Sequence, residues 1–241
     1  MSFVEDALKF HAEHNGMLAV ASKVPLNNRE DLALAYTPGV AEPCKAIKEN
    51  KELSFEYTCR GNTVAIVSDG TRVLGLGDIG PEAAMPVMEG KAVLFKTFGD
   101  VDAIPICIDT KDPEEIIETV RRLQPTFAGI NLEDFSSPKC YEIEDRLREI
   151  CDIPVFHDDQ HGTAIACLSA VMGALRYVKK DIKDVKVVVN GCGAAGSAIG
   201  RLFVSMGFPN VIMVERVGAL YKGIDLSLIH ISEPTRRVVI S

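Results

Sequence analysis

Apolar residues follow two different spacings along this chain, and the two spacings alternate. Short runs rich in β-branched residues are separated by segments with the three-to-four-residue spacing of amphipathic helices. The expected strands cover residues 63–67, 103–108, 127–132, 154–156, 185–189 and 211–214, and the expected helices between them cover residues 113–123, 139–150 and 163–178. Strands that alternate with helices predict an α/β fold with a mainly parallel sheet and helices on both faces.

The first 40 residues carry helix signals instead of strand signals. Ser2 and Glu5 have the spacing of a capping box, and Gly16 stands where such a helix would end. A second helix is expected over residues 28–35. Pro38 ends it, because the residue before a proline is pushed out of the α region.

The composition narrows the class of protein. The chain has 241 residues, 47% hydrophobic and 25% charged, which is typical of a folded globular protein. Its 26 basic and 34 acidic residues give a net charge of −8, which argues against a nucleic-acid partner. No apolar run approaches the roughly 20 residues that span a membrane, and residues 1–10 lack the pattern of a signal peptide. Seven scattered cysteines, none in a Cys-x-x-Cys pair, favour reduced thiols and a cytoplasmic location.

A glycine-rich loop follows the clearest of the expected strands. Residues 185–189 lead into a G-x-G-x-x-G sequence, and a helical segment that ends at Gly207 comes next. Glycine lets the backbone turn sharply and approach a pyrophosphate, and the free N–H groups at the start of the helix favour its negative charge. The predicted cofactor-binding residues of this loop are Gly191, Gly193, Ala194, Ala195 and Gly196.

An acid at the end of the next strand bears on the choice of cofactor. Glu215 follows the first glycine of the loop by 24 positions, near the spacing of about 20 expected for an acid that binds ribose hydroxyls. A carboxylate there repels a 2′-phosphate, so the sequence favours NAD, whereas the adjacent Arg216 would favour NADP. A glycine-rich turn in an unrelated α/β protein is the alternative interpretation.

A second G-x-G-x-x-G sequence, at residues 75–80, is interpreted differently. Asp78 stands where a phosphate would lie, and Pro86 is expected to interrupt a helix that starts at Pro81. The segment is therefore predicted to be a tight loop that lines a site.

Two acidic segments follow two of the expected strands. Parallel strands end at the same edge of a sheet, where α/β proteins bind their ligands. Converging carboxylates repel one another, and a hard cation such as Mg²⁺ or Mn²⁺ would relieve that repulsion. Acidic turn and helix-cap residues are the alternative. The acids are Glu133, Asp134, Asp158 and Asp159, and the neighbouring His157 and His161 are interpreted as supporting or packing residues.

Three further side chains are candidates for chemistry. Tyr36 lies in a sharp bend before Pro38, which either aims its phenol into a cleft or packs it with a bonded hydroxyl. Lys91 precedes an apolar run. It is therefore either desolvated, with a pKa below the usual value of about 10.4, or extended along the surface. Arg72 either binds a substrate carboxylate or pairs with Asp69.

Six segments, in order along the chain, resemble malic enzymes of the bacterial type. They are residues 35–44, 68–80, 89–96, 131–135, 155–164 and the glycine loop at 190–196. The resemblance implies an N-terminal malic-enzyme-type α/β domain followed by the first part of a Rossmann-like dinucleotide-binding domain. It also implies oxidative decarboxylation of malate to pyruvate and CO₂ with NAD or NADP, in a homodimer or higher oligomer. A malolactic enzyme, which yields lactate, and a non-catalytic binding module are the alternatives.

The same resemblance implies roles for individual residues. Lys91 is the general base that takes the malate hydroxyl proton, and Tyr36 is the acid that protonates the enolpyruvate carbon. Asp158 orients Lys91 or relays protons, and Arg72 meets a substrate carboxylate. The implied ligands of Mg²⁺ or Mn²⁺ are Glu133, Asp134 and Asp159.

The resemblance divides the chain into parts and ends near residue 223. Residues 1–157 are expected to bind malate, and residues 158–225 to form part of the NAD(P)-binding domain. Residues 226–236 resemble one reading frame of a sequencing-library adapter, so residues 226–241 are expected to be a non-native tail. On this expectation the chain is a truncated form of a longer enzyme with an exposed sheet edge. A non-functional fragment is therefore a third alternative.

Overall fold

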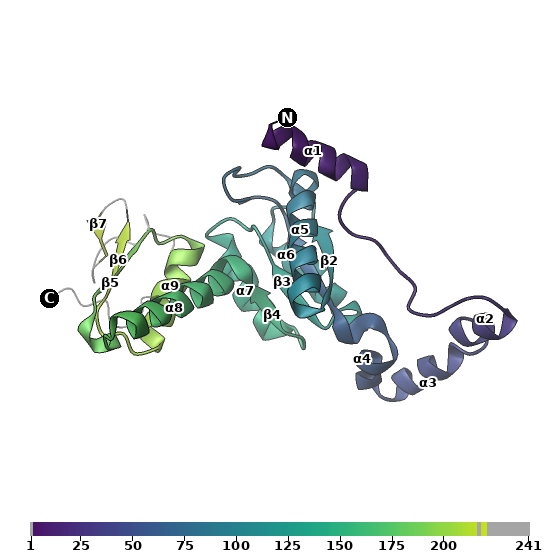
Figure 1. The fold of residues 1–241 in the computed structure, drawn as a ribbon. Coiled ribbons are helices and arrows are strands. Elements are labelled where there is room, and N and C mark those ends of the chain that lie inside the picture. Colours follow the sequence, from purple (N-terminus) through teal and green to yellow (C-terminus); the bar gives the residue numbers. More distant parts are fainter. Residues whose placement is uncertain (1, 216–217, 221–241) are drawn as a thin grey trace.

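The computed structural model of the chain contains two β-sheets joined by a long helix (Figure 1). It describes residues 2–215 and 218–220. The first sheet has the order β2-β1-β3-β4, with all neighbours parallel. Its strands are β1 (Thr63–Ser68), β2 (Asp102–Cys107), β3 (Gly129–Leu132) and β4 (Val155–His157). The second sheet consists of β5 (Val187–Asn190), the parallel β6 (Val211–Glu215) and the short antiparallel β7 (Gly218–Ala219). The predicted α/β class with mainly parallel strands is confirmed.

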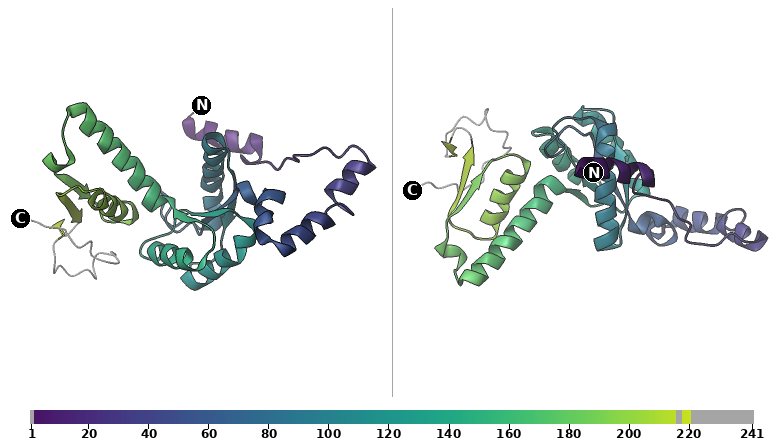
Figure 2. Two further views of the ribbon diagram at one scale, coloured as in Figure 1. Left: turned by 90° about the horizontal axis from the view of Figure 1, so that it is seen from below. Right: turned by 45° about the horizontal axis from the view of Figure 1, so that its top comes forward.

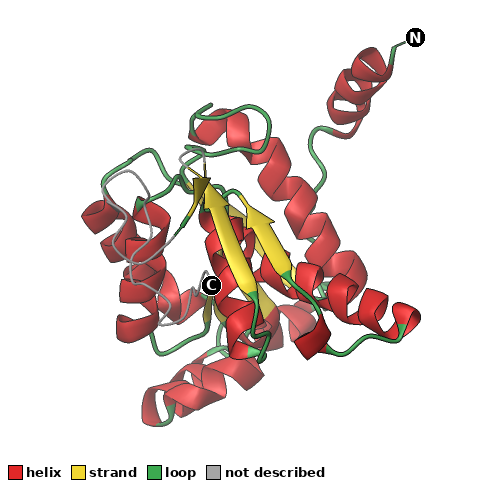
Figure 3. Cartoon of the chain, turned by 90° about the vertical axis from the view of Figure 1, so that its left-hand side faces the viewer, coloured by secondary structure: helices red, strands yellow, loops and turns green. Residues whose placement is uncertain are grey.

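Helices cover both faces of the first sheet (Figure 3). They are α5 (Pro81–Gly99), α6 (Pro113–Leu123) and α7 (Lys139–Ile150). Successive residues of a strand point to opposite faces, and β1 illustrates the consequence. Ile66 packs with Met88 of α5 on one face, whereas Ala65 and Val67 belong to the core that includes Ile116 of α6 on the other face. The helix bounds predicted for α6 and α7 are those of the structure.

Helix α5 runs through Pro86, so the predicted interruption is wrong. Pro86 has no N–H to donate to the carbonyl four residues earlier, which removes one hydrogen bond near the start of the helix. Three buried side chains, Ala84, Met88 and Ala92, nevertheless hold the helix against the sheet. Lys91 therefore projects from the middle of a 19-residue helix.

Helix α8 (Asp158–Val178) joins the two sheets and begins five residues earlier than predicted. Its N-cap is His157, which makes no side-chain capping bond, so Asp158 and Asp159 are the first two residues of the helix. The interpretation of these acids as helix caps is therefore wrong. Further along, Leu175 of α8 packs into a second core with Phe203 of α9 (Ala194–Ser205).

The N-terminal helices bury no residue of their own. They are α1 (Phe3–His14), with the predicted Ser2–Glu5 capping box, α2 (Arg29–Ala35), which begins one residue later than predicted and is capped by Asn28, and α3 (Ala41–Glu49). In Figures 1 and 2, α2 and α3 reach away from the sheets. Apolar side chains such as Leu34 (72% exposed) and Val20 are open to solvent along this segment.

Short helical turns complete the described chain. They are α4 (Ser54–Tyr57) and the 3₁₀ turns η1 (Lys51–Leu53), η2 (Cys59–Asn62), η3 (Gln124–Thr126) and η4 (Ile182–Asp184). All seven cysteines are free thiols. Among the described residues, no helix combines the length and the apolar character that crossing a membrane requires.

Candidate active site

The register of two neighbouring strands brings the predicted acids together. Leu132 at the end of β3 pairs with His157 at the end of β4, so the residues that follow, from Glu133 and from Asp158, leave the sheet side by side. Asp134 has a φ of +57°, a left-handed conformation that turns the chain directly after the strand. Non-glycine residues adopt this conformation rarely, and aspartate tolerates it better than most.

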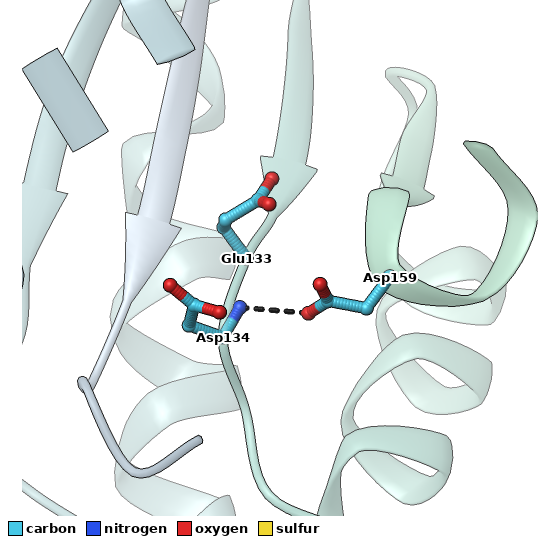
Figure 4. Close-up of side chains that lie close together, drawn as sticks. All are labelled: Glu133, Asp134 and Asp159. Carbon is cyan, nitrogen blue, oxygen red and sulfur yellow. Dashed lines mark hydrogen bonds between the residues drawn. The ribbon is translucent and has the colours of Figure 1, made fainter. Parts of the chain in front are cut away.

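Three carboxylates converge at this edge (Figure 4). Glu133, Asp134 and Asp159, called the carboxylate cluster below, each offer an oxygen within 4.8 Å of the others. Glu133 and Asp134 are buried, and Asp159 is partly buried. The backbone N–H of Asp134 donates to Oδ2 of Asp159 at 2.9 Å, the bond drawn in Figure 4, which ties the end of β3 to the start of α8.

Lys91 lies beside the carboxylate cluster. Its Nζ is 2.6 Å from Oδ2 of Asp158 and 3.0 Å from Oε1 of Glu133. The other oxygen of Glu133 accepts a hydrogen bond of 2.9 Å from Nδ2 of the buried Asn131. Gly162 makes room for this arrangement, because a Cβ there would lie 1.9 Å from Oδ1 of Asp158.

Burial and mutual repulsion shift the pKa values of the cluster. Desolvation, together with the charges of Asp159 and Glu133, raises the pKa of Asp134 to about 7. Desolvation also raises the pKa of Glu133, although Lys91 opposes it. The pKa of Asp159 lies below its usual value, because His157 and the Asp134 N–H outweigh the desolvation of its carboxyl group. One lysine thus offsets only part of the negative charge gathered here.

The pKa of Lys91 differs from the value expected for a desolvated lysine. Burial acts to lower this pKa, but the hydrogen bond to Asp158 and the charge of Glu133 raise it by more, so it lies above the usual value. The expectation of a lowered pKa is therefore wrong for the protein without a bound cation. The reason is that Lys91 is desolvated together with two carboxylates.

The carboxylate cluster has the chemistry of a site for a hard divalent cation. Its donors are all carboxylate oxygens, which suit Mg²⁺ or Mn²⁺ better than softer metals. A cation there would offset the charge repulsion that, together with burial, raises the pKa values of Asp134 and Glu133. The residues therefore fit the metal that the sequence predicted.

Arg72 borders the same edge but does not pair with Asp69. The backbone N–H of Arg72 donates to the carbonyl of Asp134 at 2.9 Å, and Asp69 pairs instead with Lys139 and Thr71. Within the described part of the chain, the Arg72 guanidinium forms no hydrogen bond or ion pair. The predicted tight loop at residues 75–80 follows it and leads directly into α5.

Tyr36 is not brought to Lys91 within one chain. It forms the end of α2, is 67% exposed, and lies on the segment that reaches away from the sheets in Figures 1 and 2. The structure thus brings together Lys91, Asp158 and the carboxylate cluster, places Arg72 at their border, and leaves Tyr36 apart.

The glycine loop has the local geometry of the predicted strand–turn–helix unit. Gly191 has a φ of +99° after β5, and α9 begins at Ala194. A Cβ on Gly196 would lie 1.8 Å from the carbonyl oxygen of Gly191, so a glycine is required for the turn to close. Oε1 of Glu215 accepts the backbone N–H of Cys192 at 2.8 Å, which places this acid beside the loop. Arg216 lies outside the described residues.

Sequence reasoning gave no role to Asn131 or to Glu144. Asn131 and Glu133 are two positions apart at the end of one strand, so a two-residue period would have placed them on the same side. Glu144, which is buried and bonded to Gln160 and His161, is joined to residues 16 and 17 positions away. The one sequence signal for Glu144 is that it is a charged residue at a position whose spacing places it on the apolar face of α7.

Comparisons with known proteins identify the family of this chain. Residues 15–148 match the N-terminal domain of malic enzymes. The bifunctional malic/malolactic enzyme of Bacillus subtilis is 54% identical over 92% of this chain and 54% of its own length. The NAD-dependent malic enzyme of Geobacillus stearothermophilus is 56% identical over 86% of this chain and 43% of its own. The crystal structure of malic enzyme from Pyrococcus horikoshii has a TM-score of 0.89 and 49% identity, covering 94% of this chain and 55% of that one.

The chain belongs to the malic enzyme family. It spans about half the length of the curated relatives it matches. The expected non-native tail at residues 226–241 lies outside the described residues, and the domain division at residue 157 remains a prediction.

The raised pKa of Asp134 predicts how stability depends on pH without metal. Between its usual value of 3.8 and about 7, folded Asp134 holds a proton that the unfolded chain has lost. This proton's contribution to the free energy of unfolding is fully present below pH 3.8 and is lost as the pH rises through about 7. We expect the free energy of unfolding to fall by on the order of 2 kcal/mol between pH 5 and pH 8 from this group.

Thermal unfolding in a chelating buffer measures this effect. Asp134→Asn, which has no proton to lose, should flatten the decline, whereas the exposed control Asp152→Asn should keep it. An equal decline in all three proteins would contradict the assignment.

Proposed function

We propose that this chain comprises the malate-binding domain and part of the nucleotide domain of an NAD(P)-dependent, divalent-metal-dependent malic enzyme that converts malate to pyruvate and CO₂. The observation that carries the proposal is the position of Lys91, held between Asp158 and Glu133 beside the carboxylate cluster. Membership of the malic enzyme family supports the same reaction.

The residues at this edge suit the first chemical step. A Mg²⁺ or Mn²⁺ ion bound to Glu133, Asp134 and Asp159 would act as a Lewis acid toward the malate oxygens and the electrons of the breaking carbon–carbon bond. A cation bound to Glu133 would offset the charge that raises the pKa of Lys91, and the neutral amine then takes the proton of the malate hydroxyl while hydride passes from the hydroxyl-bearing carbon to NAD(P). Asp158 holds the amine in position at 2.6 Å. Arg72, with its guanidinium free among the described residues, binds a substrate carboxylate.

The last step requires an acid, and Tyr36 is proposed for it. Protonation of the enolpyruvate carbon needs a positioned donor within hydrogen-bond reach. Because Tyr36 lies on an exposed segment away from Lys91, we propose that the tyrosine of one chain completes the site of a second copy. The exposed apolar residues of this segment, among them Leu34 and Val20, support a homodimer that buries them.

The proposed dinucleotide is NAD, bound at the glycine loop of residues 191–196. Glu215 beside the loop favours the ribose hydroxyls over a 2′-phosphate. The relative from Geobacillus stearothermophilus is NAD-dependent. Residues 1–157 are accordingly proposed to bind malate and residues 158–225 to belong to the nucleotide domain. The unpaired cysteines favour a cytoplasmic location.

A malolactic reaction is the second candidate, because the Bacillus subtilis relative has both activities. Product analysis with malate, Mn²⁺ and NAD separates the two. We expect pyruvate with one NADH formed for each malate consumed. Lactate without net NADH would contradict oxidative decarboxylation and favour the malolactic reaction.

The variant Lys91→Ala tests the proposed base. We expect its malate-dependent rate to fall about 10²- to 10⁴-fold, the usual contribution of a general base. Oxaloacetate has no hydroxyl proton to lose and needs no nucleotide, so its Mn²⁺-dependent decarboxylation should fall much less. The control is Lys96→Ala, an exposed lysine of the same helix. Equal losses on both substrates, or no loss on malate, would contradict the role of Lys91.

Mixing two inactive variants tests whether Tyr36 acts across a dimer. In a mixed dimer of Lys91→Ala and Tyr36→Phe chains, one of the two sites combines an intact Lys91 with an intact Tyr36 from the partner. Random exchange of equal amounts should therefore restore about one quarter of the wild-type rate. If Tyr36 acts within its own chain, the mixture stays inactive.

A further inference from the structure

A chain of buried polar side chains runs from helix α7 to the carboxylate cluster, and the proposed reaction does not use it. Glu144 of α7, Gln160 of α8 and His157 at the end of β4 are each 3% exposed or less. They are called the positioning chain below. Buried polar groups need partners to offset their lost hydration, and each of these contacts the next.

The hydrogen bonds of the positioning chain fix which atoms face each other. Nε2 of Gln160 lies 2.8 Å from Oε2 of Glu144 and 2.8 Å from Nδ1 of His157. The other oxygen of Glu144 lies 2.7 Å from Nε2 of His161. A glutamate carboxylate only accepts, so the amide NH₂ of Gln160 faces it, and the second N–H of that group points to His157.

This arrangement determines the tautomer of His157. Because Nδ1 accepts from Gln160, the ring hydrogen of the neutral imidazole sits on Nε2. Nε2 lies 3.3 Å from Oδ2 of Asp159. The alignment there is not that of a hydrogen bond, so Nε2 is one of the few buried side-chain polar atoms among the described residues without one.

The end of the positioning chain therefore points at a member of the carboxylate cluster. Oδ2 of Asp159 accepts the Asp134 N–H and faces the His157 N–H. Since Oδ2 accepts the Asp134 N–H and also faces Nε2 of His157, Oδ1 is the oxygen of Asp159 left to bind a cation. Groups behind a metal ligand typically change metal affinity 10- to 100-fold when removed.

We propose that Glu144, Gln160 and His157 form a positioning chain that fixes Asp159 as a one-oxygen ligand of the proposed divalent cation. The inference rests on the metal site of the proposed function and adds to it three residues that touch neither substrate nor metal. If these residues serve only to pack α7 against α8, their loss should change the stability of the protein but not its affinity for the cation.

Two substitutions of His157 separate the two roles. In His157→Asn the amide lies near the position of Nδ1 and no donor reaches Asp159, whereas in His157→Gln the amide reaches the position of Nε2. Gln160→Met breaks the chain one residue further away at similar volume. Isothermal titration of each 241-residue protein with Mn²⁺ gives the dissociation constant, and thermal unfolding without metal gives the stability.

The expected order of Mn²⁺ affinity follows from whether each variant keeps a hydrogen-bond donor facing Asp159. His157→Asn should weaken binding about 10- to 100-fold, and Gln160→Met about tenfold. His157→Gln should recover most of the loss, although the unfolding midpoints of the two His157 variants are alike. Wild-type affinity in His157→Asn and Gln160→Met, or equal losses in His157→Asn and His157→Gln, would overturn the inference.

A separate control distinguishes failure of this inference from failure of the metal site itself. Asp134→Asn removes a proposed ligand and leaves the positioning chain intact. If the wild-type chain binds no Mn²⁺, or binds it equally with Asp134→Asn, the metal site is contradicted and the positioning chain with it. If Asp134→Asn abolishes binding and the chain variants do not weaken it, only the positioning chain is contradicted.

Discussion

The surplus of buried negative charge at the end of β3 and β4 is the constraint on which the rest of the site depends. Three carboxylates offer oxygens within 4.8 Å of one another, and Lys91 contacts one of them, Glu133, directly. The parallel register of the two strands makes this crowding unavoidable once acids follow both strand ends. Burial, together with the charges of Asp159 and Glu133, raises the pKa of Asp134 in the absence of a cation. Carboxylates that repel one another in the empty site are well suited to binding a divalent ion, since each of them attracts the cation.

Helix α8 connects this edge to the second sheet. Its first turn carries Asp158 and Asp159, and its later turns share a core with α9, the helix that follows the glycine loop. A substrate near the cluster would thus lie at the start of α8, and a dinucleotide near the loop would lie at the start of α9. These two helices pack against each other. The N-terminal segment is the exception, because α1, α2 and α3 bury no residue of their own. Its apolar side chains are exposed, and Tyr36, the proposed acid, lies on the same segment away from the other candidates, which is why the proposed dimer is drawn on to complete the site.

The sequence predicted what depends on local pattern and missed what depends on contacts between distant residues. Helices 113–123 and 139–150 have the predicted bounds because apolar spacing, joined in the first helix by the Asp112 cap, is a local signal. The meeting of Glu133 with Asp159 was also predictable, since parallel strands end at one edge. Pro86 misled the prediction because buried neighbours on α5 outweigh one lost hydrogen bond. The pKa of Lys91 was predicted in the wrong direction because its partner Asp158, 67 positions away, cannot be seen in a local window.

The most direct test of the central claim is the position of a bound cation. Crystals of the 241-residue chain grown with Mn²⁺ and measured near the manganese absorption edge would locate the ion by its anomalous signal. We expect one strong peak in contact with an oxygen from each of Glu133, Asp134 and Asp159, with Oδ2 of Asp159 still facing His157. Crystals that contain Mn²⁺ but show no peak among these carboxylates, or show the three side chains turned away from one another, would contradict it.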